Sequence, residues 1–222
     1  MPGFKKFLPE VRFGGERITP DEVDTPVYYQ VHKPSVGTAA FATITAGTVS
    51  GNMTLVTSQP DYPRNLLVTI VGPAGGAGGT INVTGYNQFG DPQTEAIGFA
   101  TAAAGGTAAG TKIWGKFGTI AYVHAGGDNT STVTVGAAIG TAAGLVGYLG
   151  LPVRIKNVSD VKNITWIKNG TYTPINLGTI DSTLVSTSLH AFRGTAIMAA
   201  TDEWTVVVRS TYNSEGNRKQ WS

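Results

Sequence analysis

Residues 37–151 form a segment that is almost free of charge, and this feature limits the folds open to the chain more than any other. Only seven of its 115 residues are charged, whereas charged residues make up about 25% of an average globular protein. They are Asp61, Arg64, Asp91, Glu95, Lys112, Lys116 and Asp128. So few charges can hardly cover the surface of the segment. Either Thr, Asn and Gly solvate it, or partner subunits cover part of it.

The composition and the spacing of apolar residues favour an all-β fold. The 222 residues include 30 glycines, and the helix-favouring residues Lys, Glu, Arg and Leu are scarce. Short apolar or alternating runs, separated by turn residues, predict strands. We expect these strands at residues 66–71, 80–86, 93–99, 117–123, 131–135, 161–168, 171–175, 196–200 and 203–210. Many short strands joined by turns predict an antiparallel β-sandwich-like domain.

One of these segments also predicts which way its side chains point. Alternation along residues 80–86 places Ile81 and Val83 on one face of a strand, and Asn82, Thr84 and Tyr86 on the other. The apolar face is expected in the core, and the Asn82 and Thr84 face either in solvent or against a partner.

The dipeptide at residues 169–170, Asn-Gly, lies between two strand-like runs and predicts a hairpin. A type I′ turn needs φ > 0 at both central residues, and Asn-Gly is the pair that best provides it. A two-residue turn here pairs Lys168 with Thr171 and Ile167 with Tyr172, and so sets the register of both strands.

Residues 1–36 differ from the rest and predict an extended N-terminal arm. They carry five basic and five acidic side chains and five prolines, which remove backbone donors and disfavour helix. Residues 37–222 are then the β-sandwich domain, with residues 152–222, where ordinary charge density returns, as a candidate sub-lobe. The apolar side chains of the arm suit a groove on a neighbouring chain. We therefore expect deletion of residues 1–36 to leave a folded domain and abolish assembly.

Composition and motifs argue against most enzymes and cofactors. The chain has no cysteine, and its three histidines form no metal-binding motif. The glycine-rich residues 72–80 lack the Gly-Lys-Ser/Thr ending of a phosphate-binding loop and precede a strand. A net charge of +2 gives no reason to expect nucleic acid or an anionic membrane as partner, and no run of 18 apolar residues occurs. We therefore expect no enzymatic activity, no cofactor and no metal.

A carbohydrate-active enzyme is the enzymatic alternative that the sequence leaves open. Such a site needs two carboxylates at a set separation. Asp91 and Glu95 flank an expected turn, whereas the adjacent Asp202 and Glu203 would face opposite sides of a strand.

Four short motifs, in order and at consistent spacing over residues 53–155, resemble a family of tailed-bacteriophage virion structural proteins. The first is TSQPDYPRNL at residues 57–66, where that family has a PD-x-PRN segment. The second is the hairpin INVTGYNQFGDPQTE at residues 81–95, and the third is KFGTI at residues 116–120. The last comprises Val135-Gly136 and GYLGLP at residues 147–152. The stretch from Ala137 to Gly147 is longer and richer in Gly and Ala than the family pattern.

The resemblance implies a non-enzymatic component of a phage particle. The leading expectation is a capsid decoration, or cement, protein that lies on the capsid surface of the virion. Its partners would be the major capsid protein and copies of itself, in a homo-oligomer for which a trimer is one arrangement. The alternative expectation is a tail or fibre component with receptor-binding capacity.

Nine residues are candidates for contacts between subunits. The aromatic ones lie in the arm, Asp61 and Arg64 lie in the first motif, and the last two lie on the polar face of residues 80–86. They are Phe4, Phe7, Phe13, Tyr28, Tyr29, Asp61, Arg64, Asn82 and Thr84. For Asp61 and Arg64 the alternative is an ion pair within the chain that fixes the start of the strand at Leu66.

Overall fold

The computed structural model describes most of the chain, and nearly all of its regular structure is antiparallel strand. The described residues are 11–13, 16–18, 24–34, 36, 41–45, 51–52, 54–55, 59–72, 77–100, 106–127, 130–142, 145–168, 171–175 and 180–211. Within these ranges the one helical element is a single 3-10 turn, η2 (Val158–Asp160). The predicted all-β fold is confirmed.

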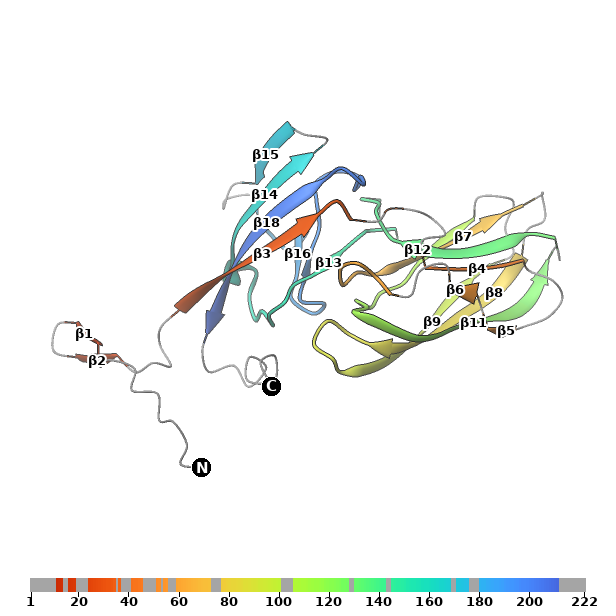
Figure 1. Ribbon diagram of the computed structural model, residues 1–222, viewed down its shortest axis with the longest axis horizontal. Helices are drawn as coiled ribbons and strands as arrows, with labels where there is room; N and C mark the ends of the chain where they lie inside the picture. The colour runs from red at the N-terminus through yellow and green to blue at the C-terminus, as the bar shows by residue number, and fades with distance from the viewer. Residues whose placement is uncertain are drawn as a thin grey trace, which may run out of the picture.

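Two sheets packed face to face form the lobe on the right of Figure 1, which we call the first lobe. One sheet has the strand order β10 (Thr107–Ala109), β7 (Leu66–Val71), β12 (Thr132–Ala137), β4 (Ala42–Thr45) and β6 (Thr54–Leu55). The other has the order β5 (Gly51–Asn52), β11 (Lys116–Gly127), β8 (Ala77–Tyr86) and β9 (Pro92–Phe99). This lobe is a β-sandwich.

Alternating apolar side chains from both sheets fill the sandwich. Leu66 and Val68 of β7 meet Ile81 and Val83 of β8, and all four are at most 1% exposed. Trp114, which lies just before β11, is fully buried in the same core. The period-2 pattern that marks these strands in the sequence is thus the pattern that buries them.

A second lobe, on the left of Figure 1, has its own core. Its larger sheet has the order β15 (Thr171–Ile175), β14 (Val161–Lys168), β18 (Glu203–Thr211) and β3 (Asp24–His32). Its smaller sheet has the order β13 (Leu149–Gly150), β17 (Ala191–Phe192) and β16 (Val185–Ser186). Trp166 and Trp204 stack in the core, with ring centroids 5.5 Å apart.

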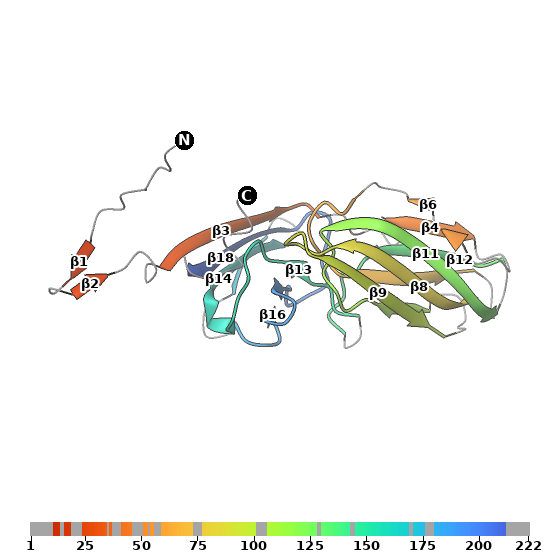
Figure 2. The same ribbon diagram turned by 90° about the horizontal axis from the view of Figure 1, so that it is seen from below.

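The first lobe is inserted into the second. Strand β3 belongs to the second lobe, β4 to β12 build the first, and β13 to β18 complete the second. The chain therefore passes between the lobes twice. Figures 1 and 2 show the two lobes end to end along the longest axis of the molecule.

The predicted orientation of residues 80–86 and the predicted hairpin register are both confirmed. Asn82 and Thr84 are exposed, opposite to the buried Ile81 and Val83. Strand β14 pairs with β15 in the expected register, Lys168 with Thr171 and Ile167 with Tyr172. The dipeptide at residues 169–170 itself lies outside the described residues.

The arm differs from its prediction. Residues 24–32 form β3, which pairs along its whole length with β18, from Asp24–Thr211 to His32–Glu203. Val31 is 1% exposed in the second core, so this segment is part of a folded lobe. Nearer the N-terminus, β1 (Val11–Phe13) and β2 (Glu16–Ile18) form a separate two-stranded antiparallel sheet.

The strand predicted at residues 196–200 is wrong. These residues form an irregular segment in which Met198 is 5% exposed. The Met198 N–H donates to the Ile139 carbonyl at 3.0 Å, which ties the segment to the crossing between the lobes. Within this apolar run Met198 is buried but its neighbour Ile197 is 58% exposed, and the run pairs with no strand in the described part of the chain.

Candidate interface surfaces

The outward side of the four-stranded sheet of the first lobe is a broad, weakly charged surface, which we call the Thr84 face. Antiparallel pairing sets its side chains in rows across β9, β8 and β11. The middle row is Thr94, Thr84 and Thr119, in which the Thr84 and Thr119 hydroxyl oxygens lie 2.7 Å apart. The neighbouring rows are Ala96, Asn82 and Ala121 on one side and Pro92, Tyr86 and Lys116 on the other.

Charge is nearly absent from the Thr84 face. Of the outward side chains that the structure describes on β8, β9 and β11, Lys116 alone is formally charged. Two large apolar side chains stand out from the surface, Tyr86 at 45% and Val123 at 43% exposure. Part of the uncharged surface expected from residues 37–151 is thus this one face of one sheet.

A groove of about 420 Å³ crosses the Thr84 face beside Tyr86. Its lining includes Thr84, Thr94 and Gly118. The β11 ladder is irregular between Phe117 and Thr119, and at Gly85 opposite a Cβ would meet the Lys116 carbonyl oxygen at 2.2 Å. Gly85 therefore allows the close approach of β8 to β11, and Gly118, which has no side chain, lines the groove next to the protruding Tyr86 ring.

Residues of the first motif, at positions 59–65, fix the backbone where the two lobes meet. The Gln59 side chain bonds both main-chain groups of Phe117: its Oε1 accepts from the N–H at 2.7 Å and its Nε2 donates to the carbonyl at 3.1 Å. The Pro63 carbonyl accepts from the Gly150 N–H at 2.7 Å. The first, third and fourth motifs, far apart in the sequence, are thus joined by direct hydrogen bonds.

Asn65 makes the densest set of these bonds. It is 3% exposed, and its Nδ2 donates to the carbonyls of Gly110 at 3.1 Å and Val146 at 2.7 Å. Its Oδ1 accepts from the Tyr148 N–H at 2.8 Å. One amide thereby holds three segments of chain together.

Asp61 and Arg64 form the ion pair that the sequence suggested within the chain. Their Oδ1 and guanidinium nitrogen lie 2.7 Å apart, and Arg64 is 1% exposed. Burial lowers the pKa of Arg64, while the nearby Asp61 carboxylate opposes that shift. Arg64 is enclosed by its own chain, so the pair locks the entry to β7 and the arginine is not available to a neighbouring subunit.

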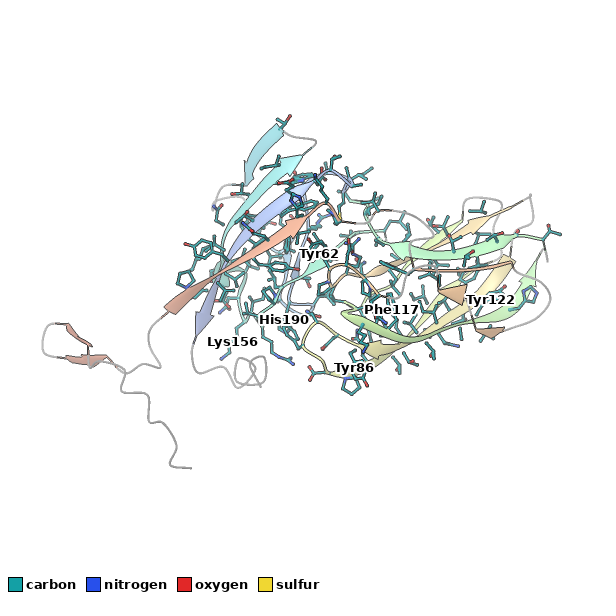
Figure 3. All side chains as sticks on the ribbon, viewed as in Figure 1. Tyr62, Tyr86, Phe117, Tyr122, Lys156 and His190 are labelled. Atoms are coloured by element: carbon teal, nitrogen blue, oxygen red, sulfur yellow. The ribbon has the colours of Figure 1, made fainter. Side chains whose placement is uncertain are left out.

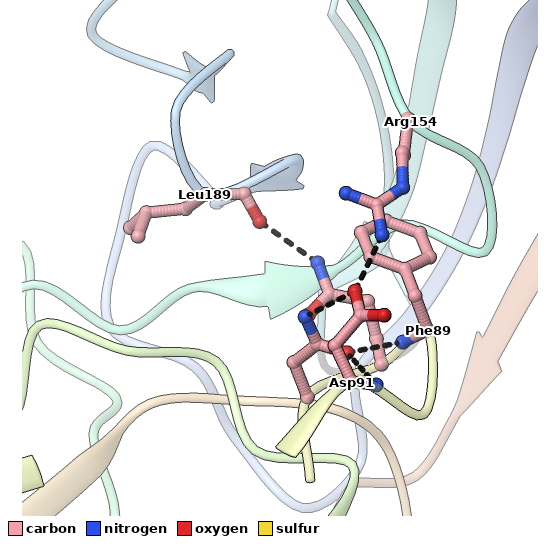
Figure 4. A network of polar contacts seen from close by, with 6 residues as sticks. Phe89, Asp91, Arg154 and Leu189 are labelled. Carbon is pink, nitrogen blue, oxygen red and sulfur yellow. Dashed lines mark hydrogen bonds and ion pairs between the residues drawn. The ribbon is translucent and has the colours of Figure 1, made fainter. Parts of the chain in front are cut away.

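The turn at residues 87–91, from the second motif, contacts the second lobe (Figure 4). The Gln88 Nε2 donates to the Leu189 carbonyl at 2.8 Å, and Asp91 pairs with Arg154 at 2.5 Å. The Arg154 guanidinium lies over the Phe89 ring, 4.4 Å from its centroid. These contacts clamp the tip of the first lobe onto the second.

His190 completes this junction; Figure 3 labels its side chain, near the middle of the molecule. Its ring meets Phe89 edge-on, with ring centroids 5.4 Å apart, and its Nδ1 lies 3.2 Å from the Ile155 nitrogen and 3.1 Å from the Ile155 carbonyl oxygen. Burial lowers the pKa of His190, the Arg154 charge adds to the shift, and hydrogen bonding to Ile155 opposes it. Arg154 and His190 escaped sequence reasoning because nothing local marks a contact between positions 63 or more residues apart.

The two tyrosine candidates of β3 point in opposite directions. Tyr28 is 70% exposed on the outer face of the second-lobe sheet. Tyr29 points inward and meets Phe192 edge-on at 6.3 Å, and its burial raises the pKa of its hydroxyl. Tyr29 is thus a core residue, and Tyr28 stays a surface candidate.

The phenylalanine candidates lie near the N-terminus. Phe4 and Phe7 lie outside the described residues, and Phe13 ends β1. No helix in the described part of the chain is long and apolar enough to cross a membrane. The same residues hold no group of three or more His, Cys, Asp or Glu side chains placed to bind a metal ion.

The carboxylates considered for glycoside chemistry are engaged internally. Glu95 Oε1 accepts from the Thr111 N–H at 2.5 Å, and its Oε2 accepts from the Trp114 indole N–H at 3.1 Å. Asp91 is held by Arg154 and by the Asn87 amide at 3.2 Å. In this arrangement both groups fasten loops.

Sequence reasoning found Asn82 and Thr84 but did not select Tyr86 as a contact residue. The same period-2 pattern places it on their face, so the signal was present. The groove beside Tyr86 depends on the bulge in β11, and no pattern in the sequence predicted that bulge. Comparisons with protein-family models, with curated proteins and with solved structures found no match to this chain.

Proposed function

We propose that this chain is a structural protein of a tailed-bacteriophage virion, of the capsid decoration type. It binds the outside of the shell, contacts the major capsid protein and further copies of itself, and stabilises the particle by joining neighbouring subunits. It performs no enzymatic step and needs no cofactor, nucleic acid or membrane.

The observation that carries the proposal is the convergence of three of the four motifs behind the family resemblance: the first, the third and the fourth. Gln59 bonds Phe117, Pro63 bonds Gly150, and Asn65 bonds Tyr148. Motifs that resembled a family by chance would be expected to scatter over the fold. These meet at one junction and fix its backbone, as expected of motifs kept for a shared architecture.

Two further features support a role in assembly. The molecule is an elongated pair of lobes with long, twisted sheets (Figure 2). One of its broad faces, the Thr84 face, is nearly uncharged. Interface centres are depleted in charge in the same way.

The test is the copy number of the chain in purified virions of the phage that encodes it. We expect quantitative mass spectrometry to find it in a constant ratio to the major capsid protein. We also expect density for it on the outer shell in an image reconstruction. Virions without the chain would overturn the proposal.

One observation favours the alternative, a tail or fibre component with receptor-binding capacity. A depression of about 190 Å³ on the second lobe is lined mainly by side chains that can hydrogen-bond, among them Gln30, His32 and Glu203. Tyr28, exposed on the same face, adds an aromatic surface. A low copy number set by the symmetry of the tail, with binding to host cells, would favour this alternative.

A further inference from the structure

We propose that the Thr84 face is a self-complementary docking surface, on which two copies of this chain meet about a two-fold axis. In this contact the Tyr86 ring of each copy enters the groove of the other. The inference adds to the proposed function by naming the surface through which copies associate; its biological setting rests on that function, although the contact itself does not.

The position of the ring relative to the groove makes the contact reciprocal. Tyr86 is 45% exposed and is itself part of the groove wall, with Thr84, Thr94 and Gly118. When the ring of one copy enters the groove of a second, the ring of the second therefore lies beside the first copy's groove. A surface with adjacent knob and groove is what a two-fold, isologous contact requires.

The groove is large enough for this guest. Pockets of about 300 to 1,000 Å³ accept drug-sized molecules, and this one, at about 420 Å³, needs to take only a phenol ring. Hydroxyls of Thr84 and Thr94 line the groove, so the tyrosine hydroxyl finds hydrogen-bond partners as it leaves water.

Charge explains why the occupant is a second copy. In a two-fold contact each residue near the axis meets its own equivalent, so any charge there faces a like charge. The rows at Asn82 and Thr84 consist of Asn, Thr and Ala and can meet themselves without repulsion. Lys116, at the end of the Tyr86 row, is the exception, and it can extend its ammonium group to the rim.

The experiment is sedimentation equilibrium of the full chain and three variants over a range of concentrations. We expect the unmodified chain to associate to the mass of a dimer. Thr84→Lys and Tyr86→Ala should each raise the dissociation constant by about a hundredfold or more, because each removes a central contact or buries an unpaired charge. Lys116→Gln should tighten association by removing repulsion between like charges.

Val71→Lys is the matched control. Val71 is 54% exposed at the end of β7, on the other sheet of the same lobe, so it receives the same charge away from the proposed contact. We expect its dissociation constant to be unchanged. Circular dichroism of each variant establishes that it is folded, and Tyr86→Ala stands in if Thr84→Lys fails to fold.

The outcomes separate this inference from the proposed function. A chain that is monomeric at every concentration, or an oligomer that Tyr86→Ala leaves unchanged, would overturn the docking surface even if virions contain the chain. A dimer that both variants dissociate, formed by a chain absent from virions, would support the surface and remove the function.

Discussion

At the scale of single residues, Asn65 is the side chain that ties the first motif to two distant segments of the chain. Its amide is buried and bonds three main-chain groups in two separate segments, at Gly110 and at residues 146–148. We expect Asn65→Ala to reduce the free energy of unfolding by about 3 kcal/mol or more, since each buried main-chain group left unpaired costs about 1–3 kcal/mol. Urea denaturation measures the difference.

Asn82→Ala serves as the control for this change, since it removes the same amide from an exposed position on β8. Its effect should stay within about 0.5 kcal/mol in a monomeric sample. Equal losses in the two variants would show that the bonds of Asn65 do not stabilise the junction.

His190 should make the junction sensitive to acid. Because burial lowers its pKa in the folded chain, the unfolded chain binds the proton more readily. Its contribution to stability is therefore complete above the unfolded value, about 6.5, and falls as the pH drops from there toward the folded pKa.

His190→Asn removes the titrating group, and asparagine tolerates the left-handed backbone found there, where φ is 49°. We expect the melting temperature of this variant to fall less than that of the unmodified chain as the pH is lowered from neutral toward the folded pKa of His190. Parallel pH profiles for the two proteins would contradict the role assigned to His190.

At the scale of elements, the hairpin between β14 and β15 depends on its turn. The pair Lys168–Thr171 leaves two residues for the connection, the length at which type I′ turns occur. A type I′ turn needs φ > 0 at both central residues, and in such a turn Gly170→Val places a β-branched residue in that strained conformation. We expect a loss of about 1 kcal/mol or more, seen as a lower unfolding midpoint.

Gly98→Val is its matched control. Gly98 is exposed in β9, its φ is ordinary, and nothing lies within 4 Å of an added Cβ. Valine suits an extended, open strand position, so stability should be unchanged or slightly higher. An unchanged midpoint for Gly170→Val would mean that this turn is not of type I′.

Elements fixed by local patterns could be predicted from the sequence, and elements fixed by distant partners could not. Strand β7 has the predicted bounds, Leu66–Val71, because its apolar run and flanking turn residues are local. The two-residue strands β13, β16 and β17 carry no such signal. Strand β3 was not predicted because the nearby prolines indicated an extended arm. The residues it pairs with, in β18, lie more than 170 positions away and give no local signal.

The candidate site divides in the same way. Alternation identified the side of β8 that carries Asn82 and Thr84, and motif spacing suggested the pair of Asp61 and Arg64. The burial of Arg64 and the groove at Gly118 both depend on which strands lie next to one another. The sequence pattern does not specify that order of strands in the sheets.

At the scale of the whole molecule, the position of β3 changes what truncation should do. Deleting residues 1–36 removes an edge strand with the buried Val31, so we expect the second lobe to lose several kcal/mol of stability. Deleting residues 1–23 keeps β3 and should leave the unfolding midpoint unchanged. Differential scanning calorimetry of both truncations distinguishes them.

The shorter truncation also gives the cleaner test of the arm. If residues 1–23 fasten the protein to its neighbours, this variant should be folded yet missing from virions. Undiminished incorporation into particles would exclude an anchoring role for the segment.

The pairing of β3 with β18 sets how the molecule responds to mechanical load. Because Asp24 pairs with Thr211, the segments leading into β3 and out of β18 leave the sheet at the same end. Tension between those segments opens the pair like a zip, one rung at a time. The chain runs from β3 on to β4 of the first lobe, so tension between the N-terminal segment and that lobe is carried by the covalent backbone of β3 and does not peel the strand from β18. The second lobe is therefore easier to open by tension on its chain ends than by tension applied through the first lobe.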